Sequence, residues 1–595
     1  MLAKCNEYVK NHTYAAGAVL ALVAAVVFSG VLSNGLVYDD GKQLLENPFV
    51  RNTHLWWRIF TGSVWSFLGA AVETNFYRPL HIFSYWLIWR VAGSNPAAYH
   101  CFQWILYMAT GLVVFQIGRE VLANDLAALA GSLLWLLHPL HVEAVAWIAS
   151  VPDMGCGFFY LLAFLLFLRA EKSGDRRLAR HALAALAYFP ALFFKEAAFS
   201  FPLLVIAYGF FFPDATKPWH RRAVCWGMYV AAAGVYSMAR VAALGHFSGP
   251  RHFWKIQPKI IAAALGLLGQ HARLFSWPAK LNVFHTFDPG SSLRSPWPWL
   301  ALLILVAAGA LRKRRAVLGF LVVWWAVTLL PCLDVRQLSF PLLAERFSYL
   351  PSVGLCLALA YSSLAWMPQR LPHVAVATAV LCALGLLMCC WCFQVVRAVP
   401  NWRSNESLFG YSLNVVPDAG LVRIHHGLDL QYREHDLDGA RREFETALRA
   451  NQASFLPLNT VTYDSFIGLG QIADLEGRHD EALAYYQKAT QALPYHSLAY
   501  DVLGAFYFPR ADYQKAAEYF ERAVRVNPQD LSARFYLGAC WKKLGKYREA
   551  AGQFRAAREV DPTYGQAYTA EAQAREAAGD FTAAAQVRRL KHASE

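Results

Sequence analysis

About eleven apolar segments, all within the first 400 residues, constrain the fold of this chain more than any other feature of its sequence. Each is long enough, or nearly long enough, to span the hydrocarbon core of a bilayer, and a soluble protein of this size could not bury them all. The chain is 56% hydrophobic and has a mean hydropathy of +0.28. The sequence therefore predicts a polytopic membrane protein. The segments are residues 14–36, 98–118, 126–137, 155–168, 181–194, 199–212, 223–244, 298–311, 316–330, 352–366 and 374–393.

Basic connectors between these segments predict the orientation of the chain. Residues 169–180, 217–222 and 312–315 fall on one side if Met1 is cytoplasmic, in agreement with the positive-inside rule. With an odd number of crossings, the loop after the first segment and the C-terminal part are both extracytoplasmic. Residues 260–275 are apolar, but if they crossed the membrane, the basic residues 312–315 would be extracytoplasmic. We therefore expect them to be interfacial or re-entrant.

The formal net charge of +14 comes from the first 400 residues, because acidic and basic residues nearly balance beyond them. A basic excess confined to the membrane part argues against a nucleic-acid partner. It favours membrane lipids with anionic headgroups, or a substrate that carries phosphate.

A 34-residue repeat follows in the C-terminal part of the chain. Five kinds of position recur at this period, which is typical of tetratricopeptide repeats. Three small residues let antiparallel helices approach, an aromatic residue fills the space between them, and a proline ends each repeat. About five units, including a looser first and a polar last one, predict an α-solenoid. The columns are Gly470, Gly504 and Gly538; Ala482, Ala516 and Ala550; Tyr486, Phe520 and Phe554; Ala489, Ala523 and Ala557; Pro494, Pro528 and Pro562.

Two adjacent carboxylates, Asp39 and Asp40, follow directly on the first apolar segment. A carboxylate at the membrane boundary can stay ionised and accept a proton from a hydroxyl group, whereas one at the bilayer centre would be costly. The alternative is structural, because aspartates often cap helices or form turns, and Gly41 favours a turn.

Further polar residues interrupt the apolar sequence on the same predicted side. Arg78, in a Tyr-Arg-Pro-Leu motif, could bind a phosphate group with two donors, or extend from the membrane interface to water. The motif His-Pro-Leu-His-Val-Glu contains His138, His141 and Glu143, and Asp153 lies ten residues beyond it. This group could bind a divalent metal ion or orient a sugar, and hydrogen-bonded structural histidines are the alternative.

Two pairs of adjacent charges complete the set. Lys195 and Glu196 form either a membrane-boundary turn or a phosphate-binding lysine with its orienting carboxylate. Glu345 and Arg346 lie on the same predicted extracytoplasmic side. They belong to a substrate site or, as the alternative, form a structural ion pair. Five polar clusters on one predicted face of an apolar chain indicate an outward-facing site.

The order of these motifs resembles the transmembrane and tetratricopeptide-repeat-containing O-mannosyltransferase family. The resemblance covers nearly the whole chain, from Tyr38-Asp39-Asp40 through Ala344 to Ser352 and the joining Asn401-Trp402-Arg403 to the repeats. One departure is that residues 147–153 lack the Gly-Arg-Ala-Asp ending found in some members.

The resemblance implies a multi-pass GT-C glycosyltransferase domain over residues 1–400 and an extracytoplasmic tetratricopeptide-repeat domain over 401–595. It implies an inverting transfer of mannose or another hexose from a polyprenyl-phosphate donor to Ser/Thr hydroxyls of a protein acceptor. Asp39 and Asp40 match the acidic motif of the first outer loop in such enzymes. Arg78, Lys195, Arg346 or a divalent cation would neutralise the departing phosphate. His138, His141, Glu143, Asp153, Glu196 and Glu345 would complete the substrate site.

Two localisations stay open, and so do two functional classes besides the transferase. The chain resembles a bacterial inner-membrane protein with periplasmic repeats, because Asn405-Glu406-Ser407 is an isolated glycosylation sequon; in a eukaryote the repeats would be lumenal in the endoplasmic reticulum. A membrane-anchored repeat scaffold with a degenerate transferase domain is the second functional class. Polyprenol-lipid transport is the third, although the sequence has no clear matching halves.

Overall fold

The computed structural model describes residues 2–68, 75–173, 177–213, 219–247, 258–310, 313–335, 342–367, 374–454, 457–494, 496–562 and 564–594. The described residues form helices and connecting segments and contain no β-strand, which confirms the all-helical fold class. The chain divides into two compact units. The first comprises Met1–Ser63 and Asn75–Pro417, and the second comprises Val64–Thr74 and Asp418–Glu595. The domain boundary predicted between residues 400 and 401 stays a prediction.

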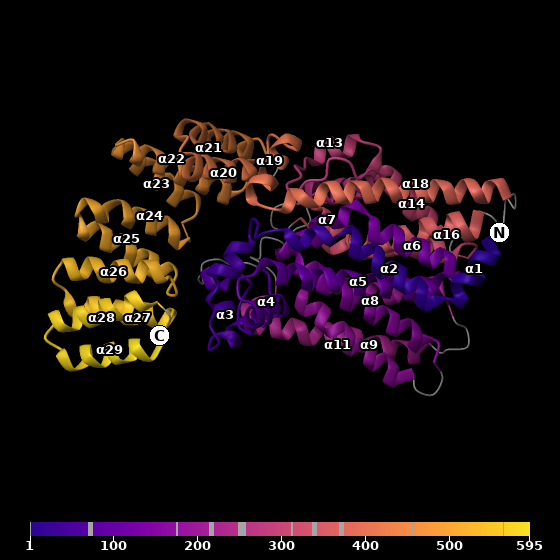
Figure 1. The fold of residues 1–595 in the computed structure, drawn as a ribbon, viewed down its shortest axis with the longest axis horizontal. Helices are drawn as coiled ribbons and strands as arrows, with labels where there is room; N and C mark the ends of the chain where they lie inside the picture. Colours follow the sequence, from indigo (N-terminus) through magenta and orange to yellow (C-terminus); the bar gives the residue numbers. More distant parts are fainter. Residues whose placement is uncertain are drawn as a thin grey trace. The chain divides into compact units, whose positions relative to one another are not determined.

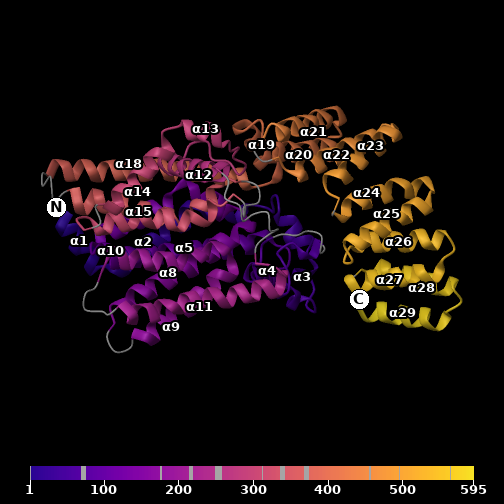
Figure 2. The same ribbon diagram turned by 180° about the vertical axis from the view of Figure 1, so that it is seen from behind.

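The first unit contains long apolar helices that run along a common direction in both views (Figures 1 and 2). Its helices are α1 (Leu2–Asn11), α2 (Thr13–Val27), α3 (Pro48–Arg51), α4 (Pro79–Ala92), α5 (Pro96–Leu122), α6 (Asp125–Leu137), α7 (Val142–Ala146), α8 (Val151–Glu171), α9 (Arg177–Phe194), α10 (Phe201–Phe211), α11 (Trp219–Leu244), α12 (Pro258–Ser276), α13 (Pro289–Arg294), α14 (Trp297–Ala310), α15 (Ala316–Leu329), α16 (Ser352–Tyr361), α18 (Val374–Ala398) and α19 (Asn405–Val415).

Close helix contacts and aromatic packing form the core of this unit. Helix α8 contacts α5 and α9, and α6 contacts α5 and α16. A Cβ atom at Gly131 of α6 would lie 2.8 Å from the Leu357 side chain of α16, so the glycine permits this approach. The Phe164 and Trp324 rings meet edge to face at 4.8 Å. These contacts hold the helix ends that carry the polar motifs.

Fewer helices reach membrane-spanning length than the sequence predicts. Within the described ranges, four helices are long and apolar enough to cross, or up to six if each of two bent pairs is one span. The bends measure 91° between α1 and α2, and 53° between α6 and the helical segment Pro139–Ala146. About eleven crossings are therefore not confirmed. Several predicted segments form helices of only 14 residues, such as α14 and α15, and about 20 residues are needed to span a bilayer.

The second unit is a stack of helix pairs (Figure 1). The pairs are α20 (Gly420–Asp429) with α21 (Leu437–Gln452), α22 (Asn459–Leu475) with α23 (His479–Ala492), α24 (Ser497–Tyr507) with α25 (Tyr513–Val526), α26 (Leu531–Lys543) with α27 (Tyr547–Val560), and α28 (Gly565–Ala577) with α29 (Phe581–Ser594). Five pairs agree with the predicted number of repeats.

Within each central repeat, the recurrent glycine faces the recurrent aromatic ring. A Cβ atom at Gly470 would lie 2.5 Å from Tyr486, and one at Gly504 would lie 2.8 Å from Phe520. The ring therefore occupies the space that a side chain at the glycine would need. This contact explains why the glycine and the aromatic residue recur together in each repeat.

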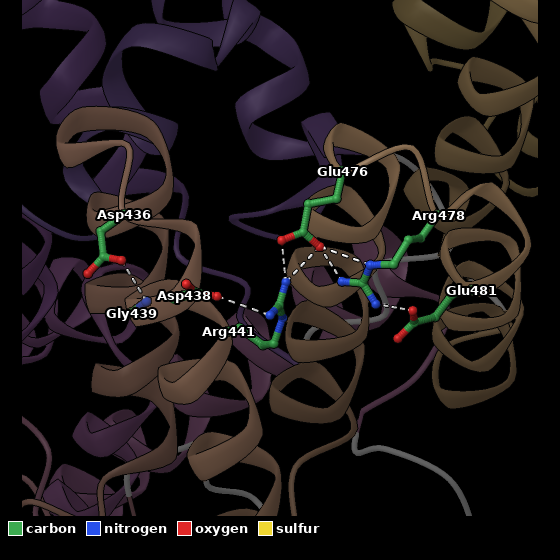
Figure 3. A network of polar contacts seen from close by, with 7 residues as sticks. All are labelled: Asp436, Asp438, Gly439, Arg441, Glu476, Arg478 and Glu481. Carbon is green, nitrogen blue, oxygen red and sulfur yellow. Dashed lines mark hydrogen bonds and ion pairs between the residues drawn. The ribbon is translucent and has the colours of Figure 1, made fainter.

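Ion pairs join neighbouring repeats at their exposed turns (Figure 3). Arg441 of α21 donates to both carboxylate oxygens of Glu476 at 2.5 and 2.7 Å. Arg478 contacts the same carboxylate and also Glu481. All of these side chains are partly exposed, so the pairs contribute little stability individually.

Candidate functional site

The two adjacent aspartates have different surroundings. Those of Asp40 indicate a structural role. Its side chain is completely buried. One carboxylate oxygen accepts from the backbone N–H of Val37 at 2.9 Å, and the other accepts from Ala149 at 2.8 Å. Asp40 thus connects its own turn to the segment that precedes α8.

Asp39 is only partly buried and lies beside basic groups. Burial raises the pKa of its carboxyl to about 6, and the positive charges of Lys42 and Arg346 oppose this rise. A carboxyl group with this pKa exchanges a proton near neutral pH, as a general base must. Of the two aspartates, Asp39 has the surroundings that fit proton transfer.

Arg346 forms an ion pair with Glu143 of α7. Its Nη1 contacts Oε1, and its backbone N–H donates to Oε2 at 2.9 Å. The guanidinium group also lies over the rings of Trp147 and Phe347, at 5.0 Å from each ring centre. The backbone contact and two rings therefore fix the position of the charge next to Asp39.

Lys195 forms an ion pair with Asp153 of α8, where Nζ lies 2.5 Å from Oδ1. The Lys195 ammonium group also lies 4.9 Å from the Phe347 ring centre. The Arg346 guanidinium group lies 5.0 Å from the centre of the same ring. Phe347 therefore contacts two cations. Cations over aromatic faces are stabilised by the ring quadrupole.

Arg78 binds the carboxylate of Glu196 with two donors, Nε at 2.9 Å and Nη2 at a shorter separation. The adjacent charges Lys195 and Glu196 thus take different partners, and the same holds for Glu345 and Arg346. The structural ion pair expected as an alternative between Glu345 and Arg346 is therefore wrong, whereas the boundary turn and the phosphate-binding role of Lys195 and Glu196 stay predictions. Lys195 has an extended backbone and Glu196 begins a short helix, so the two side chains diverge.

Glu345 precedes Arg346 in the sequence but contacts a different segment of the chain. Its buried carboxylate accepts from the backbone N–H of Asn282 and lies 2.9 Å from His285 Nε2. Burial raises the pKa of Glu345, although His285 opposes the rise. Asn282 and His285 occur in a connecting segment without a recognisable motif, so the sequence offered no signal for their participation.

A pocket with an empty volume of about 320 Å³ lies at this cluster. Lys195 and Arg346 supply its positive charge and Asp153 supplies its negative charge. Thr328 and Cys332 also line the pocket and carry no signal in the sequence, because they belong to an apolar helix end. The lining residues are Asp153, Cys156, Gly157, Lys195, Ala197, Thr328, Cys332, Arg346, Phe347, Tyr349, Leu350 and Pro351.

The two histidines of the motif do not line this pocket, although the His141 ring lies 5.2 Å from the ring of Tyr349, which does. His141 lies 3.0 Å from the Tyr107 hydroxyl and 3.0 Å from the Ser352 hydroxyl. His138 stacks on Phe275. No three His, Cys, Asp or Glu side chains in the described part of the chain are grouped as metal ligands. A divalent cation at this site stays a prediction.

The fold and this site together define a class of protein: an all-helical chain with apolar helices of membrane-spanning length, a charged pocket and an array of helical repeats. Models of the tetratricopeptide repeat match residues 428–497 and 510–574. These matches confirm the repeats.

Curated relatives carry the name of the family that the sequence resembles, which confirms the resemblance. Protein O-mannosyl-transferase TMTC4 of Homo sapiens is 24% identical over 482 residues, 69% of this chain and 63% of the relative. Protein O-mannosyl-transferase Tmtc2 of Drosophila melanogaster is 33% identical over 160 residues, 26% of this chain and 17% of the relative. The chain therefore spans less than two thirds of their length.

Solved structures match one part of the chain. The crystal structure of MamA covers 30% of this chain and 93% of its own, with 20% identity and a TM-score of 0.26. The crystal structure of YrrB, described as a TPR protein with an unusual peptide-binding site, covers 31% of this chain with a TM-score of 0.25. No functional conclusion rests on scores this low.

Proposed function

We propose that this protein is an integral membrane glycosyltransferase that transfers mannose or another hexose from a polyprenyl-phosphate donor to Ser/Thr hydroxyls of a protein acceptor. One observation carries the proposal: two fixed cations, Lys195 and Arg346, line a pocket, and the second of them neighbours a carboxylate whose pKa is near 6. The names of the curated relatives support the same activity.

In the proposed reaction, Asp39 accepts the proton of the acceptor hydroxyl as its oxygen attacks the anomeric carbon. The bond from that carbon to the phosphate oxygen breaks, and its electron pair leaves with the polyprenyl phosphate. The attack comes from the face opposite the leaving group, so the configuration inverts. Overall, a hydroxyl, a carboxylate and the polyprenyl glycosyl phosphate form a glycoside, a protonated carboxyl and free polyprenyl phosphate, which carries the negative charge.

Lys195 and Arg346 stabilise the negative charge that develops on the departing phosphate. Fixed charges in a poorly hydrated pocket stabilise such a group more than water does, because they need no reorganisation. Arg78 is the third candidate contact, from its bidentate pair with Glu196. Asp153, Glu143 and Glu196 then act as carboxylates that hold the cations in position.

Asp40 supports the reaction indirectly. Both of its oxygens accept hydrogen bonds from backbone N–H groups, and these bonds hold the turn in place. We assign proton transfer to Asp39 and the geometry of the turn to Asp40.

The acceptor chain and the membrane side complete the proposal. The repeats recruit the acceptor polypeptide or partner proteins, and both the repeats and Asp39 are extracytoplasmic. This corresponds to the periplasm in a bacterium or to the lumen of the endoplasmic reticulum in a eukaryote. Anionic lipids contact the basic connectors on the other side.

The test uses full-length protein in lipid nanodiscs with polyprenyl phosphate mannose and a Ser/Thr-containing peptide. Wild-type protein should add one hexose to the peptide, observed by mass spectrometry. Asp39→Asn should reduce the rate at least ~100-fold, because general base catalysis contributes about 10²–10⁴-fold. Full activity of Asp39→Asn would refute the assignment. Polyprenyl phosphate glucose serves as the parallel probe for another hexose.

The scaffold alternative makes a different prediction. The tetratricopeptide-repeat matches fall in the second unit, so a repeat scaffold would not need the charged pocket. Asp39→Asn protein would then complement a strain that lacks the gene as well as wild type does. Loss of complementation together with normal membrane insertion supports the enzyme.

A further inference from the structure

The residue before Asp39 has an unusual backbone conformation. Tyr38 has φ of +52°, in the left-handed region that bulky side chains rarely adopt. Such conformations persist only where surrounding contacts hold them, and they are concentrated at functional sites. The conformation of Tyr38 determines the direction in which the chain continues into Asp39.

A segment far along the sequence holds this turn in place. The Tyr38 N–H donates to Asn405 Oδ1 at 2.8 Å, 367 residues later. The N–H of Gly35 donates to the carbonyl of Arg403 at 3.0 Å. The Phe409 ring lies edge to face with Tyr38 at 6.4 Å. All of these residues belong to the first compact unit.

The Asn405 side chain is not needed to begin its own helix. Ser404 caps α19, and its hydroxyl and that of Ser407 form a reciprocal capping box. Asn405 is exposed, so burial does not explain an amide side chain at this position either. Its visible role is the hydrogen bond to Tyr38.

Two contacts fix the same turn from the other direction. Asp40 binds Val37 and Ala149, and the Tyr38 ring lies 5.6 Å from the Trp147 ring. If Tyr38 relaxed to an extended conformation, the chain would enter Asp39 in another direction. The left-handed residue and its hydrogen bond to Asn405 therefore determine where the Asp39 carboxylate is placed.

We propose that Asn405 is a positioning residue for sugar transfer, which holds Tyr38 in the left-handed conformation from which the chain enters Asp39. This inference rests on the proposed function for its role in transfer. The isolated glycosylation sequon that includes Asn405 is then a by-product of this requirement.

The experiment compares Asn405→Ala and Asn405→Asp with a matched control, Asn414→Ala, which removes an exposed asparagine from the same helix. Hydrogen exchange of the peptide covering residues 36–41 reports the Tyr38 N–H directly. Asn405→Ala should accelerate this exchange ~10-fold, because it removes one hydrogen bond. Asn405→Asp keeps the acceptor oxygen and should retain the protection. The control should behave as wild type.

Transfer from polyprenyl phosphate mannose provides the second readout. Asn405→Ala should lower kcat ~10–100-fold with little change in the KM for the donor, because misplacement of a catalytic group by ~1 Å has an effect of this size. Asn405→Asp should restore kcat. The new negative charge near Asp39 should raise the pKa of Asp39 and so move the acidic limb of the pH–rate profile to higher pH. Normal exchange in Asn405→Ala, or rapid exchange with wild-type kcat, would overturn the inference.

A third readout separates this inference from the proposed function. Carbodiimide labelling of Asp39, followed by mass spectrometry, measures how accessible the carboxyl is without any transfer reaction. If wild-type protein transfers no sugar, the proposed function fails on that result alone. A labelling rate at Asp39 that is unchanged in Asn405→Ala would then overturn the positioning role, and a raised rate would support it.

Discussion

Arg346 and Glu143 lie 203 residues apart and are joined twice, by the guanidinium group and by the backbone N–H of Arg346 at 2.9 Å. Glu143 is completely buried. Burial of a charge without its partner is strongly unfavourable. The pair therefore supports both the stability of the fold and the position of the charge beside Asp39.

We expect Glu143→Gln to lower the free energy of unfolding by roughly 3–5 kcal/mol, the usual cost of breaking a buried ion pair. Thermal unfolding in detergent measures this. Glu476→Gln is the control, because it breaks the partly exposed pair with Arg441 and should cost at most about 1 kcal/mol. Equal losses in the two variants would contradict the buried role of Glu143.

The rate of transfer should fall as the pH decreases through about 6, where Asp39 becomes protonated and can no longer accept a proton. Lys42 lowers this pKa. Lys42→Met should therefore move the acidic limb to higher pH. Initial rates between pH 5 and 8 check both expectations. A limb that does not move in Lys42→Met would show that another group titrates.

Lys195→Met should raise the KM for the polyprenyl-phosphate donor ~10-fold or more, because one charge-assisted contact to phosphate is lost. Lys195→Arg should retain part of the affinity. The control is Lys172→Met, which removes an exposed lysine paired with Glu120. Titration of donor in the transfer assay gives the KM values. A similar KM for Lys195→Met and Lys172→Met would exclude Lys195 from the donor site.

A separate prediction concerns Asp501 in the repeat array. Burial and the neighbouring Asp530 raise the pKa of Asp501 to about 9. A raised carboxyl pKa favours the folded state fully below the unfolded value near 4, and this contribution is lost as the pH rises toward 9. Asp501→Asn should therefore slow hydrogen exchange of α24 relative to wild type at pH 8 to 9. The exposed Glu518→Gln should not, and faster exchange in Asp501→Asn would contradict the prediction.

The sequence predicted well which polar residues lie together in the structure. It predicted less well which of them form ion pairs with one another. Six charged residues were all expected on one face, and the structure joins them in three ion pairs: Arg78 with Glu196, Lys195 with Asp153, and Arg346 with Glu143. The sequence left both adjacent pairs open between a structural and a binding role, because nothing in a linear motif shows the direction of a side chain. The short helices that begin at Glu196 and Glu345 turn neighbouring side chains apart.

The two units also differ in how well their folds could be predicted. Each repeat buries its aromatic residue against the glycine of the same repeat, as at Gly538 and Phe554, so a local pattern is sufficient. Apolar helices lack such a signal. Hydropathy does not separate a 14-residue helix, such as α14, from part of a longer span. The strain at Tyr38 was not predictable either, because its cause lies at Asn405.

Every cation of the proposed donor site already has a carboxylate partner: Arg78 has Glu196, Lys195 has Asp153, and Arg346 has Glu143. An arriving phosphate must share these charges with groups that never leave, so the site holds phosphate less tightly than three unpaired cations would. The spent lipid carrier keeps the same phosphate after the sugar has gone. Weak retention of that group lets the carrier diffuse back into the bilayer and free the site for the next turnover.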